Sequence, residues 1–458
     1  MYVNEGTSGC VYRPPVPCIN PIQDIQLKDK LVGKIFRLHA SAKDEWDEAM
    51  GLKKIDPGKE FTMQPRGKCK VHTNDIDFKE NECDDMQGTT FTQIIYPDGG
   101  EDLESLVHKN IIIKFSDLIE PLSNVINGIK ILQSHDYIHA DIKPLNIVYD
   151  VNGVQKAFLI DFGLSMKFPL LYNLRHNQGL RMHPYSYFPP EMRAFYVFEE
   201  SGLTLDFLES IRLAAQAAVK SFVANMNEPM SSEIKFIFKK VATSVKRIYS
   251  DCFEPLRRIM DTNKEAAFLF KSLKSVNIWD KDGQQNYMIF CSKMFTSPIQ
   301  DICAVSVTKL DIYSFGVTVF ELLVKIIRKH GASGLSRARL GLVSNFIKGC
   351  ITFDVDARSS VDQAISDWNL VLTKNKKTKK NNKQKTIKEY KPCKPDQVRN
   401  PLTHRCNKLR ANGAAKVKAS DCHAGFEPHP KTGRCIKVCL PNKIRNIVTM
   451  RCNNIKIK

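Results

Sequence analysis

Two short runs of sequence decide the fold of this chain: His139-Ala-Asp-Ile-Lys-Pro-Leu-Asn146 and Leu159-Ile-Asp-Phe-Gly163. Apolar residues flank both runs, as expected of short strands that hold a loop at its two ends. Asp161 follows Asn146 by 15 residues, so a carboxylate, a lysine, an amide and a second carboxylate occur close together in the chain. These groups suit a site for a phosphate and a divalent cation.

The runs resemble the catalytic loop and the D-F-G motif of the eukaryotic-type protein kinases, which transfer phosphate from ATP. The resemblance implies that Asp141 is the catalytic base and that Lys143 contacts the γ-phosphate. It also implies that Asn146 and Asp161 bind Mg²⁺. A lysine two residues after the base is typical of serine/threonine kinases. The expected fold is therefore an α+β, bilobal protein-kinase fold, which we assign to residues 1–372.

The run Asn4-Glu-Gly-Thr-Ser-Gly-Cys-Val-Tyr12 resembles the Gly-rich loop that covers the phosphates of ATP in that family. Gly6 and Gly9 take the second and third glycine positions, and Asn4 replaces the first. Val11 follows as a nucleotide-binding candidate.

The strand-like run Leu31-Val-Gly-Lys-Ile-Phe36 contains Lys34, which matches the lysine that contacts the α- and β-phosphates. Apolar residues then recur at helical spacing in Trp46–Ile55. This helix is expected to supply the glutamate that orients Lys34. Glu48 is the favoured candidate, and Glu45 is the alternative.

The run Phe91-Thr-Gln-Ile-Ile-Tyr96 predicts a buried strand that leads into the adenine-binding hinge. In the family, adenine is held by one hinge carbonyl and by an N–H two residues later. Pro97 has no N–H, so it offers only its carbonyl. The open candidates are Ile95 or Tyr96 as gatekeeper, and Asp98 or Gly99 as donor.

Three later motifs follow in the family's order. Ser186–Glu191 resembles the A-P-E motif, and Lys309–Gly316 resembles the start of the central helix. The resemblance implies that Asp311 braces the catalytic-loop backbone. It also implies that Arg358 pairs with Glu191.

Ala140 replaces the arginine that usually grips a phosphorylated activation loop. A phosphate on Ser165, Tyr185 or Ser186 would therefore have one cationic partner fewer. We expect activity without that form of switch.

About 119 residues separate Glu191 from Asp311, where the family has a short connection. Apolar residues recur at helical spacing within this stretch, which predicts a helical insertion in the C-terminal lobe at about 192–308.

The chain has a net charge of +19, and residues 371–458 hold 24 Lys and Arg against 4 Asp and Glu, so the excess lies in the tail. Residues 373–392 read as a basic, flexible linker because a lysine-rich run cannot bury enough apolar surface to fold. It is a candidate for binding nucleic acid or a virion component, or for nuclear import. A plain tether is the alternative.

Three copies of a C-x12-C pattern follow within residues 393–458: Cys393–Cys406, Cys422–Cys435 and Cys439–Cys452. They resemble the two-cysteine adaptor modules of large cytoplasmic DNA viruses, especially iridoviruses. So short a module needs a covalent staple, and the spacing favours disulfides over zinc. The expected tail is small, basic and cysteine-stapled.

Together these patterns predict a viral serine/threonine kinase that uses ATP and Mg²⁺ on protein substrates. The host cytoplasm is the expected location, with the virion and the nucleus left open. A silent kinase-shaped virion scaffold and a nucleic-acid-binding protein are the competing functions. No apolar run reaches about 18 residues, and Met1 adjoins the first strand, so neither a membrane span nor a signal peptide is expected. The eight other cysteines read as ordinary thiols, with a Cys69–Cys83 pair left open.

Overall fold

The computed structural model describes two compact units, Met1–Lys380 and Asn381–Lys458, each of which is considered by itself. The described residues are 2–6, 9–22, 30–72, 74, 83, 88–153, 156–167, 187–191, 249–277, 280–283, 285–287, 290, 299–381 and six short strands between 397 and 454. In that part of the chain, no helix is both long and apolar enough to cross a membrane.

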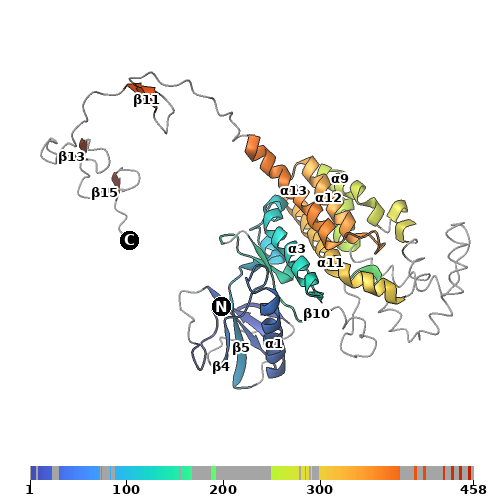
Figure 1. Cartoon of the computed structure of the whole chain (residues 1–458), viewed down its shortest axis with the longest axis horizontal. Coiled ribbons are helices and arrows are strands. Elements are labelled where there is room, and N and C mark those ends of the chain that lie inside the picture. The colour runs from blue at the N-terminus through green and yellow to red at the C-terminus, as the bar shows by residue number, and fades with distance from the viewer. Residues whose placement is uncertain are drawn as a thin grey trace, which may run out of the picture. The chain divides into compact units, whose positions relative to one another are not determined.

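The N-terminal lobe is built on a five-stranded antiparallel sheet with the order β1-β2-β3-β5-β4 (Figure 1). Its strands are β1 (Tyr2–Gly6), β2 (Gly9–Tyr12), β3 (Leu31–Phe36), β4 (Gly67–His72) and β5 (Thr90–Pro97). Helix α1 (His39–Ile55) packs on one face, where Ala42 meets Phe36 and Ile94. The strands and the helix predicted here are confirmed.

The other face of this sheet carries a second small core. Its buried members are Cys10, Tyr12, Val16, Ile35, Val71, Cys83 and Phe91. Two disulfides staple this side, Cys10–Cys83 and Cys18–Cys69, with Cα separations of 5.8 and 5.7 Å. The expectation of unpaired thiols is wrong for these four residues, and so is the Cys69–Cys83 pairing. Cys10 lies in β2 and Cys69 in β4, and two strands separate β2 from β4 in the sheet. Each of these two cysteines therefore pairs with a cysteine from a segment that connects strands: Cys10 with Cys83, and Cys69 with Cys18.

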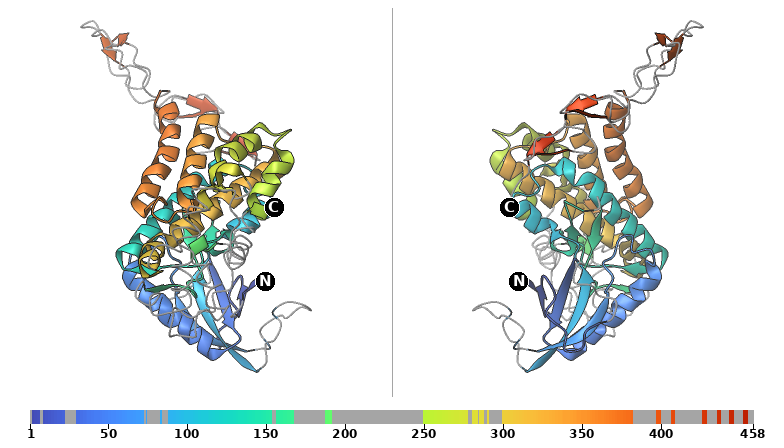
Figure 2. Two further views of the ribbon diagram at one scale, coloured as in Figure 1. Left: turned by 90° about the vertical axis from the view of Figure 1, so that its right-hand side faces the viewer. Right: turned by 90° about the vertical axis from the view of Figure 1, so that its left-hand side faces the viewer.

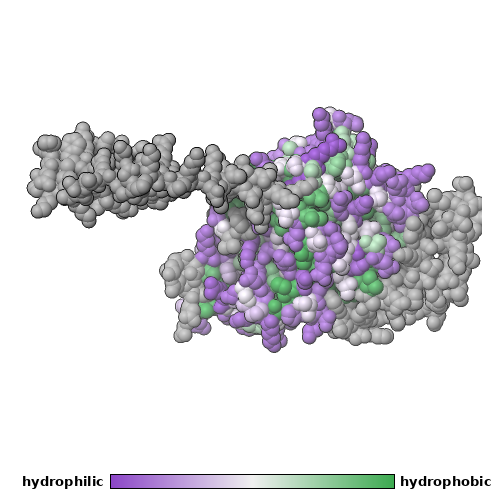
Figure 3. Space-filling view, turned by 45° about the horizontal axis from the view of Figure 1, so that its top comes forward, coloured by the Kyte–Doolittle hydropathy of each residue, from purple (hydrophilic) through white to green (hydrophobic). Residues whose placement is uncertain are grey.

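The C-terminal lobe is mainly helical and lies at the other end of this unit (Figure 2). Its longer helices are α3 (Ile119–Ser134), α11 (Ile299–His330), α12 (Arg337–Ile351) and α13 (Val361–Asn381). Its shorter turns and helices are α2 (Leu103–His108), η2 (Phe115–Asp117), η3 (Pro144–Asn146), η4 (Tyr249–Phe253), α8 (Glu254–Ile259), α9 (Lys264–Ser272) and η5 (Lys274–Val276). Nearly every side chain of α11 from Leu310 to Ile327 is buried, so this helix is the centre of the lobe. On the face drawn in Figure 3, hydrophobic residues form only small patches among polar ones.

Short strands hold the loops between the lobes. Strands β6 (Glu101–Asp102), β8 (Ile147–Tyr149) and β9 (Ala157–Leu159) form one small sheet, and β7 (Tyr137–Ile138) pairs with β10 (Met166–Lys167). These strands flank the two runs that decided the fold, as predicted.

The loop after α1 fastens this helix to the other lobe. The Asp56 carboxylate accepts the N–H groups of Glu60, Phe61 and Thr62 at 2.8, 3.1 and 3.0 Å. Phe61 is fully buried in the helical core, and its carbonyl oxygen accepts the N–H of Leu159 at 2.8 Å. Helix α1 is thereby fixed to the strand that leads into the D-F-G run.

The predicted insertion is described only in part. Within it, α8 and α9 bury Leu256 and Leu269 in the same core as α11 and α12, so this portion belongs to the lobe. Helix α11 begins at Ile299, so the helix start near 309 is wrong, while the end of the insertion at about 308 stays a prediction. The run of apolar residues continues upstream of Lys309 without a helix-breaking residue, which explains the longer helix.

Helix α13 continues to Asn381, so the predicted linker does not begin at 373. Lysine is a good helix former, and no Gly or Pro interrupts residues 361–381. The described residues of the second unit form three two-stranded antiparallel hairpins: β11 (Gln397–Arg399) with β12 (Cys406–Lys408), β13 (Phe426–Pro428) with β14 (Cys435–Lys437), and β15 (Lys443–Arg445) with β16 (Cys452–Asn454). In each copy, the second cysteine begins the second strand. Cys393, Cys422 and Cys439 lie outside the described residues.

Candidate active site

The catalytic loop brings three predicted residues together. Asp141 Oδ2 accepts hydrogen bonds from Lys143 Nζ at 2.8 Å and from Asn146 Nδ2 at 2.7 Å. Asn146 Nδ2 also donates to the carbonyl oxygen of Asp141 at 2.9 Å. Lys143 and Asn146 therefore hold the Asp141 carboxylate in one orientation within the loop.

Asp311 braces the backbone of this loop, as predicted. Its carboxylate accepts the N–H groups of His139 and Ala140 at 2.8 and 3.0 Å. Burial raises the pKa of Asp311, and these backbone donors oppose that effect. Ala140 has a φ of +61°, a left-handed conformation that costs energy for a residue with a Cβ. The two bonds to Asp311 hold this turn, and with it the position of Asp141.

His139 supports the loop from inside. Its Nδ1 accepts the N–H of Asp141 at 3.2 Å, and its Nε2 lies 3.1 Å from the carbonyl oxygen of Ile160. Both contacts are satisfied by the neutral ring with its proton on Nε2. Burial lowers the pKa of His139, which favours that form. Its ring also packs on Phe162 with a centroid distance of 4.4 Å, which joins the catalytic loop to the D-F-G run.

The donor set fits Mg²⁺. Asn146 uses its amide nitrogen to hold Asp141, so its amide oxygen is the atom that it could offer to a cation, and Asp161 is exposed, with a φ of +59°. In the part of the chain that is described, no three His, Cys, Asp or Glu side chains group to hold a metal alone. Mg²⁺ commonly takes only one or two protein oxygens and completes its shell with phosphate oxygens and water. Asn146 and Asp161 match that requirement.

The β1–β2 hairpin places the predicted Gly-rich run beside β3. Gly6 pairs with Gly9 across the hairpin, and Val11 pairs with Lys34 across the next strand boundary. A Cβ on Gly9 would lie 2.0 Å from the carbonyl oxygen of Ile35. Glycine is therefore needed at position 9 for close packing on β3, as well as for any approach to phosphate.

The glutamate that binds Lys34 is Glu45, and the preference for Glu48 is wrong. Lys34 Nζ lies 2.5 Å from Glu45 Oε2, and the Tyr96 hydroxyl donates to Glu45 Oε1 at 2.9 Å. Helix α1 begins only three residues after β3 ends, so its second turn already stands beside Lys34. Glu48 lies about 4.5 Å further along the helix axis.

Glu48 has a different partner, which sequence reasoning missed. Its Oε1 accepts a hydrogen bond from Ser165 Oγ, and Ser165 Oγ also lies 3.3 Å from the Tyr137 hydroxyl. Burial is the main cause that raises the pKa of Glu48 to about 7. The hydrogen bond from Ser165 lowers this pKa, and the nearby charges of Glu45 and Asp161 raise it further. The sequence signal was the i, i+3 spacing of two glutamates on one helix, which places both on the same face.

The structure favours one candidate in each pair of hinge alternatives. The Tyr96 hydroxyl reaches the ion pair described above, which favours Tyr96 over Ile95 as the gatekeeper. The N–H of Asp98 donates to the carbonyl oxygen of Lys30 at 2.9 Å and is therefore not the adenine donor. Of the two predicted donors, Gly99 remains.

Comparison with known proteins agrees with this geometry. Residues 77–193 match the family model of the protein kinase domain, a range that includes the catalytic loop and the D-F-G run. Residues 77–193, about a quarter of the chain, thus carry the signature of a protein kinase domain.

Short segments of the chain are similar to curated kinases. They are 41% identical over 58 residues to the dual specificity protein kinase zak2 of Dictyostelium discoideum. They are 32% identical over 79 residues to a serine/threonine-protein kinase of Candida glabrata, and 35% over 54 residues to a probable casein kinase I homologue of Encephalitozoon cuniculi. These matches span 12–17% of this chain and only 9–17% of the relatives' own lengths.

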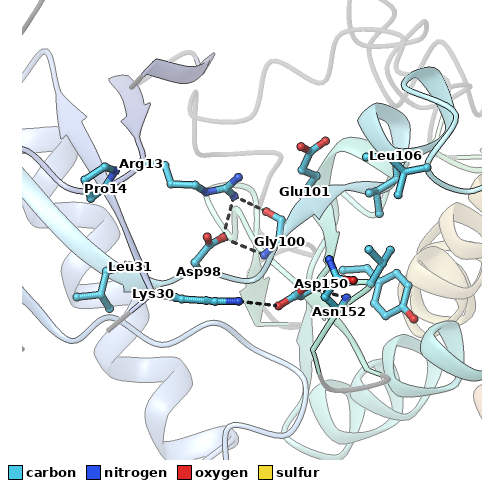
Figure 4. A pocket seen from close by; sticks show the side chains of 13 residues that line it. Arg13, Pro14, Lys30, Leu31, Asp98, Gly100, Glu101, Leu106, Asp150 and Asn152 are labelled. Carbon is cyan, nitrogen blue, oxygen red and sulfur yellow. Dashed lines mark hydrogen bonds and ion pairs between the residues drawn. The ribbon is translucent and has the colours of Figure 1, made fainter. Parts of the chain in front are cut away.

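A hollow of about 450 Å³ lies behind the hinge of the kinase domain (Figure 4). Arg13 crosses it and donates to Asp98 Oδ1 at 2.8 Å and to the carbonyl oxygen of Gly100 at 2.7 Å. Leu31 lines this hollow, whereas Lys34 lies on the other face of β3 because side chains alternate along a strand. The hollow therefore lies on the opposite face of β3 from the Lys34 side chain, and the Arg13 contacts tie Asp98 and Gly100 to the end of β2.

The C-terminal lobe also contains the predicted pair of Glu191 with Arg358. Glu191 Oε1 accepts a further hydrogen bond from Ser306 Oγ at 2.7 Å. Tyr185 and Ser186, named above as candidate phosphorylation sites, lie outside the described residues.

Proposed function

We propose that this chain is a serine/threonine protein kinase that transfers the γ-phosphate of ATP to protein hydroxyl groups. One observation carries the proposal: Asp141, Lys143 and Asn146 meet within hydrogen-bonding distance in a loop braced by Asp311. A scaffold that had lost catalysis would have no need to keep this arrangement.

Each group has a stated task in the proposed reaction. Asp141 orients the acceptor hydroxyl and takes up its proton, while Lys143 neutralises charge on the transferred phosphate. Lys34, oriented by Glu45, holds the α- and β-phosphates. Bound Mg²⁺, held by Asn146 and Asp161, would supply further neutralisation of phosphate charge.

The hinge geometry supports a single register for adenine. The Pro97 carbonyl would accept from the adenine amino group, and the Gly99 N–H would donate to the ring two residues later. A Cβ on Gly99 would lie 2.6 Å from Val148 Cγ2, so the hinge backbone passes close over β8. This close approach suits a thin slot for a planar base.

Serine and threonine are the proposed acceptors because Lys143 stands two residues after Asp141. The Candida glabrata relative is named a serine/threonine kinase and zak2 a dual specificity kinase, so tyrosine is the alternative acceptor to test. Ala140 supports activity without a phosphorylated activation loop.

A viral setting and adaptor-like tail remain part of the proposal. The support is the C-x12-C repetition and the common offset of the three hairpins, each of which starts four residues after the first cysteine of its copy. The host cytoplasm is the proposed location, with the virion and the nucleus as outcomes that imaging of infected cells would distinguish.

The deciding experiment measures γ-phosphate transfer from Mg-ATP to peptides that differ only in a serine, threonine or tyrosine acceptor. Wild type is compared with Asp141→Asn and with Asp362→Asn, a surface aspartate whose side chain is 72% exposed. We expect transfer to serine and threonine that Asp141→Asn abolishes and Asp362→Asn retains. Silence of wild type, with no nucleotide binding, would leave a scaffold built on a kinase fold.

The tail favours a second activity, binding of nucleic acid. Residues 371–458 carry 24 basic against 4 acidic residues, and such a segment binds phosphate backbones by releasing counterions. Binding that weakens steeply with salt and disappears on deletion of 382–458 would support this activity. Binding that survives the deletion would place it elsewhere.

A further inference from the structure

Helix α1 is held at two points by two glutamates that share one face. Glu45 binds Lys34 and Tyr96, which belong to the N-terminal lobe. Glu48 accepts a hydrogen bond from Ser165, which belongs to the segment that follows the D-F-G run. Of the two glutamates, Glu48 is therefore the one that joins helix α1 to the start of the activation segment.

Ser165 stands on a short, well-anchored piece of backbone. Its N–H donates to the carbonyl oxygen of Phe162 at 2.7 Å, and the next two residues pair as β10 with β7. Only three residues separate Ser165 from Asp161. A displacement of α1 transmitted through Ser165 would therefore reach the carboxylate that the proposed reaction places at the metal.

The catalytic loop has no charged side chain next to His139 that could hold the activation segment. Ala140 carries no side-chain donor, so it cannot grip the activation segment. The described start of this segment is held instead by the β10–β7 pairing and by the Ser165 contact with α1.

We propose that Glu48 and Ser165 form a latch that sets the position of Asp161 for phosphoryl transfer, and that they act as positioning residues rather than as ligands of ATP. The inference rests on the proposed kinase function and adds a second task to helix α1. Glu45 orients the phosphate-binding lysine, and Glu48 aligns the D-F-G run.

A double-mutant cycle tests the latch in the full-length chain. Ser165→Ala and Glu48→Ala each remove the contact, and the double variant removes both partners. Loss of this hydrogen bond supports an expected fall in kcat of about tenfold for either single variant. The KM for ATP should stay within about twofold, because Lys34 and Glu45 are untouched. The double variant should lose no more than the worse single variant.

Conservative and control variants separate positioning from general damage. Ser165→Thr keeps the hydroxyl and Glu48→Gln keeps an acceptor oxygen, so both should retain most of kcat. Asp47→Ala removes an exposed carboxylate from the same helix and should change neither constant. Additive losses in the double variant, or an equal rise in KM for ATP, would overturn the latch.

A second readout does not depend on catalysis. Backbone hydrogen exchange of residues 162–167 should accelerate in both Ser165→Ala and Glu48→Ala, and to the same extent in the double variant. If the wild type did not transfer phosphate, the proposed function would be wrong. Hydrogen exchange would still show whether the contact between Glu48 and Ser165 holds the segment. Unchanged exchange in all three variants would show that Glu48 and Ser165 do not hold the segment.

Discussion

Arg358 clamps Glu191 with two hydrogen bonds, Nη1 to Oε1 at 2.5 Å and Nη2 to Oε2 at 2.9 Å, and neither side chain is exposed to solvent. The guanidinium group also stacks over the Tyr313 ring at 5.0 Å. The two residues are 167 positions apart, so the pair joins distant parts of the C-terminal lobe.

Loss of this pair should be costly. Arg358→Ala would leave the Glu191 carboxylate buried and without its cation, which typically lowers the free energy of unfolding by about 3–5 kcal/mol. Denaturant unfolding of the full chain measures the change. Arg258→Ala, which removes a surface partner of Glu254, is the matched control and should cost less than about 1 kcal/mol. Equal effects of the two variants would contradict the buried-pair argument.

The corrected partner of Lys34 gives a kinetic prediction. Glu45→Gln removes the charge that orients Lys34, so the KM for ATP should rise and kcat/KM should fall by about tenfold or more. Steady-state kinetics with varied ATP measures this. Asp44→Asn, an exposed neighbour on the same helix, should behave as wild type. If Glu48→Gln raised the KM for ATP and Glu45→Gln did not, the assignment would revert to Glu48.

Glu48 should make stability depend on pH. Its pKa in the folded protein is about 7, raised from the ordinary value of 4.5 mainly by burial. Below the pKa that Glu48 has in the unfolded protein, the carboxyl group is protonated in both the folded and the unfolded protein. The contribution of Glu48 to the free energy of unfolding is therefore fully present at such low pH. As pH rises, the unfolded state releases this proton first, and the contribution is lost by the time pH passes the folded pKa.

Glu48→Gln lacks this titration and isolates it. In metal-free buffer, the variant should gain unfolding free energy relative to wild type between about pH 5 and about pH 8. Urea unfolding at several pH values provides the measurement. A difference that stays constant across this range would show that Glu48 titrates as an ordinary glutamate.

The disulfides of the N-terminal lobe can be located by peptide mapping, and their contribution to stability can be measured. Peptide mapping without reduction should recover Cys10 linked to Cys83 and Cys18 linked to Cys69, with Cys252 and Cys350 as thiols. Replacing Cys18 and Cys69 together by serine should lower the free energy of unfolding by roughly 2–4 kcal/mol. Recovery of all four N-terminal cysteines as thiols from the purified, unreduced protein would contradict both statements.

Sequence patterns predicted correctly which candidate site residues would meet in the catalytic loop, because these residues are close together along the chain. Asp141, Lys143 and Asn146 lie on one loop, and local geometry alone brings them together. Glu191 and Arg358 were paired correctly only because a family resemblance supplied the long-range contact.

Positions that depend on how elements are placed in space were harder to predict. The choice between Glu45 and Glu48 depends on where α1 starts relative to β3, which helical periodicity does not specify. The disulfide partners depend on the strand order β1-β2-β3-β5-β4, because Cys10 and Cys69 occupy strands that are not neighbours. Helix α13 starts in the packed lobe and continues into the lysine-rich run as far as Asn381. From composition alone, that run was predicted to be a linker.

The hydrogen bond from Ser306 to Glu191 fastens both ends of the long insertion to one carboxylate. Ser306 and Glu191 are 115 positions apart, and Arg358 binds the same carboxylate. A change at Glu191 would therefore release Ser306 of α11 as well as Arg358, so three separate parts of the chain would lose their common partner at once.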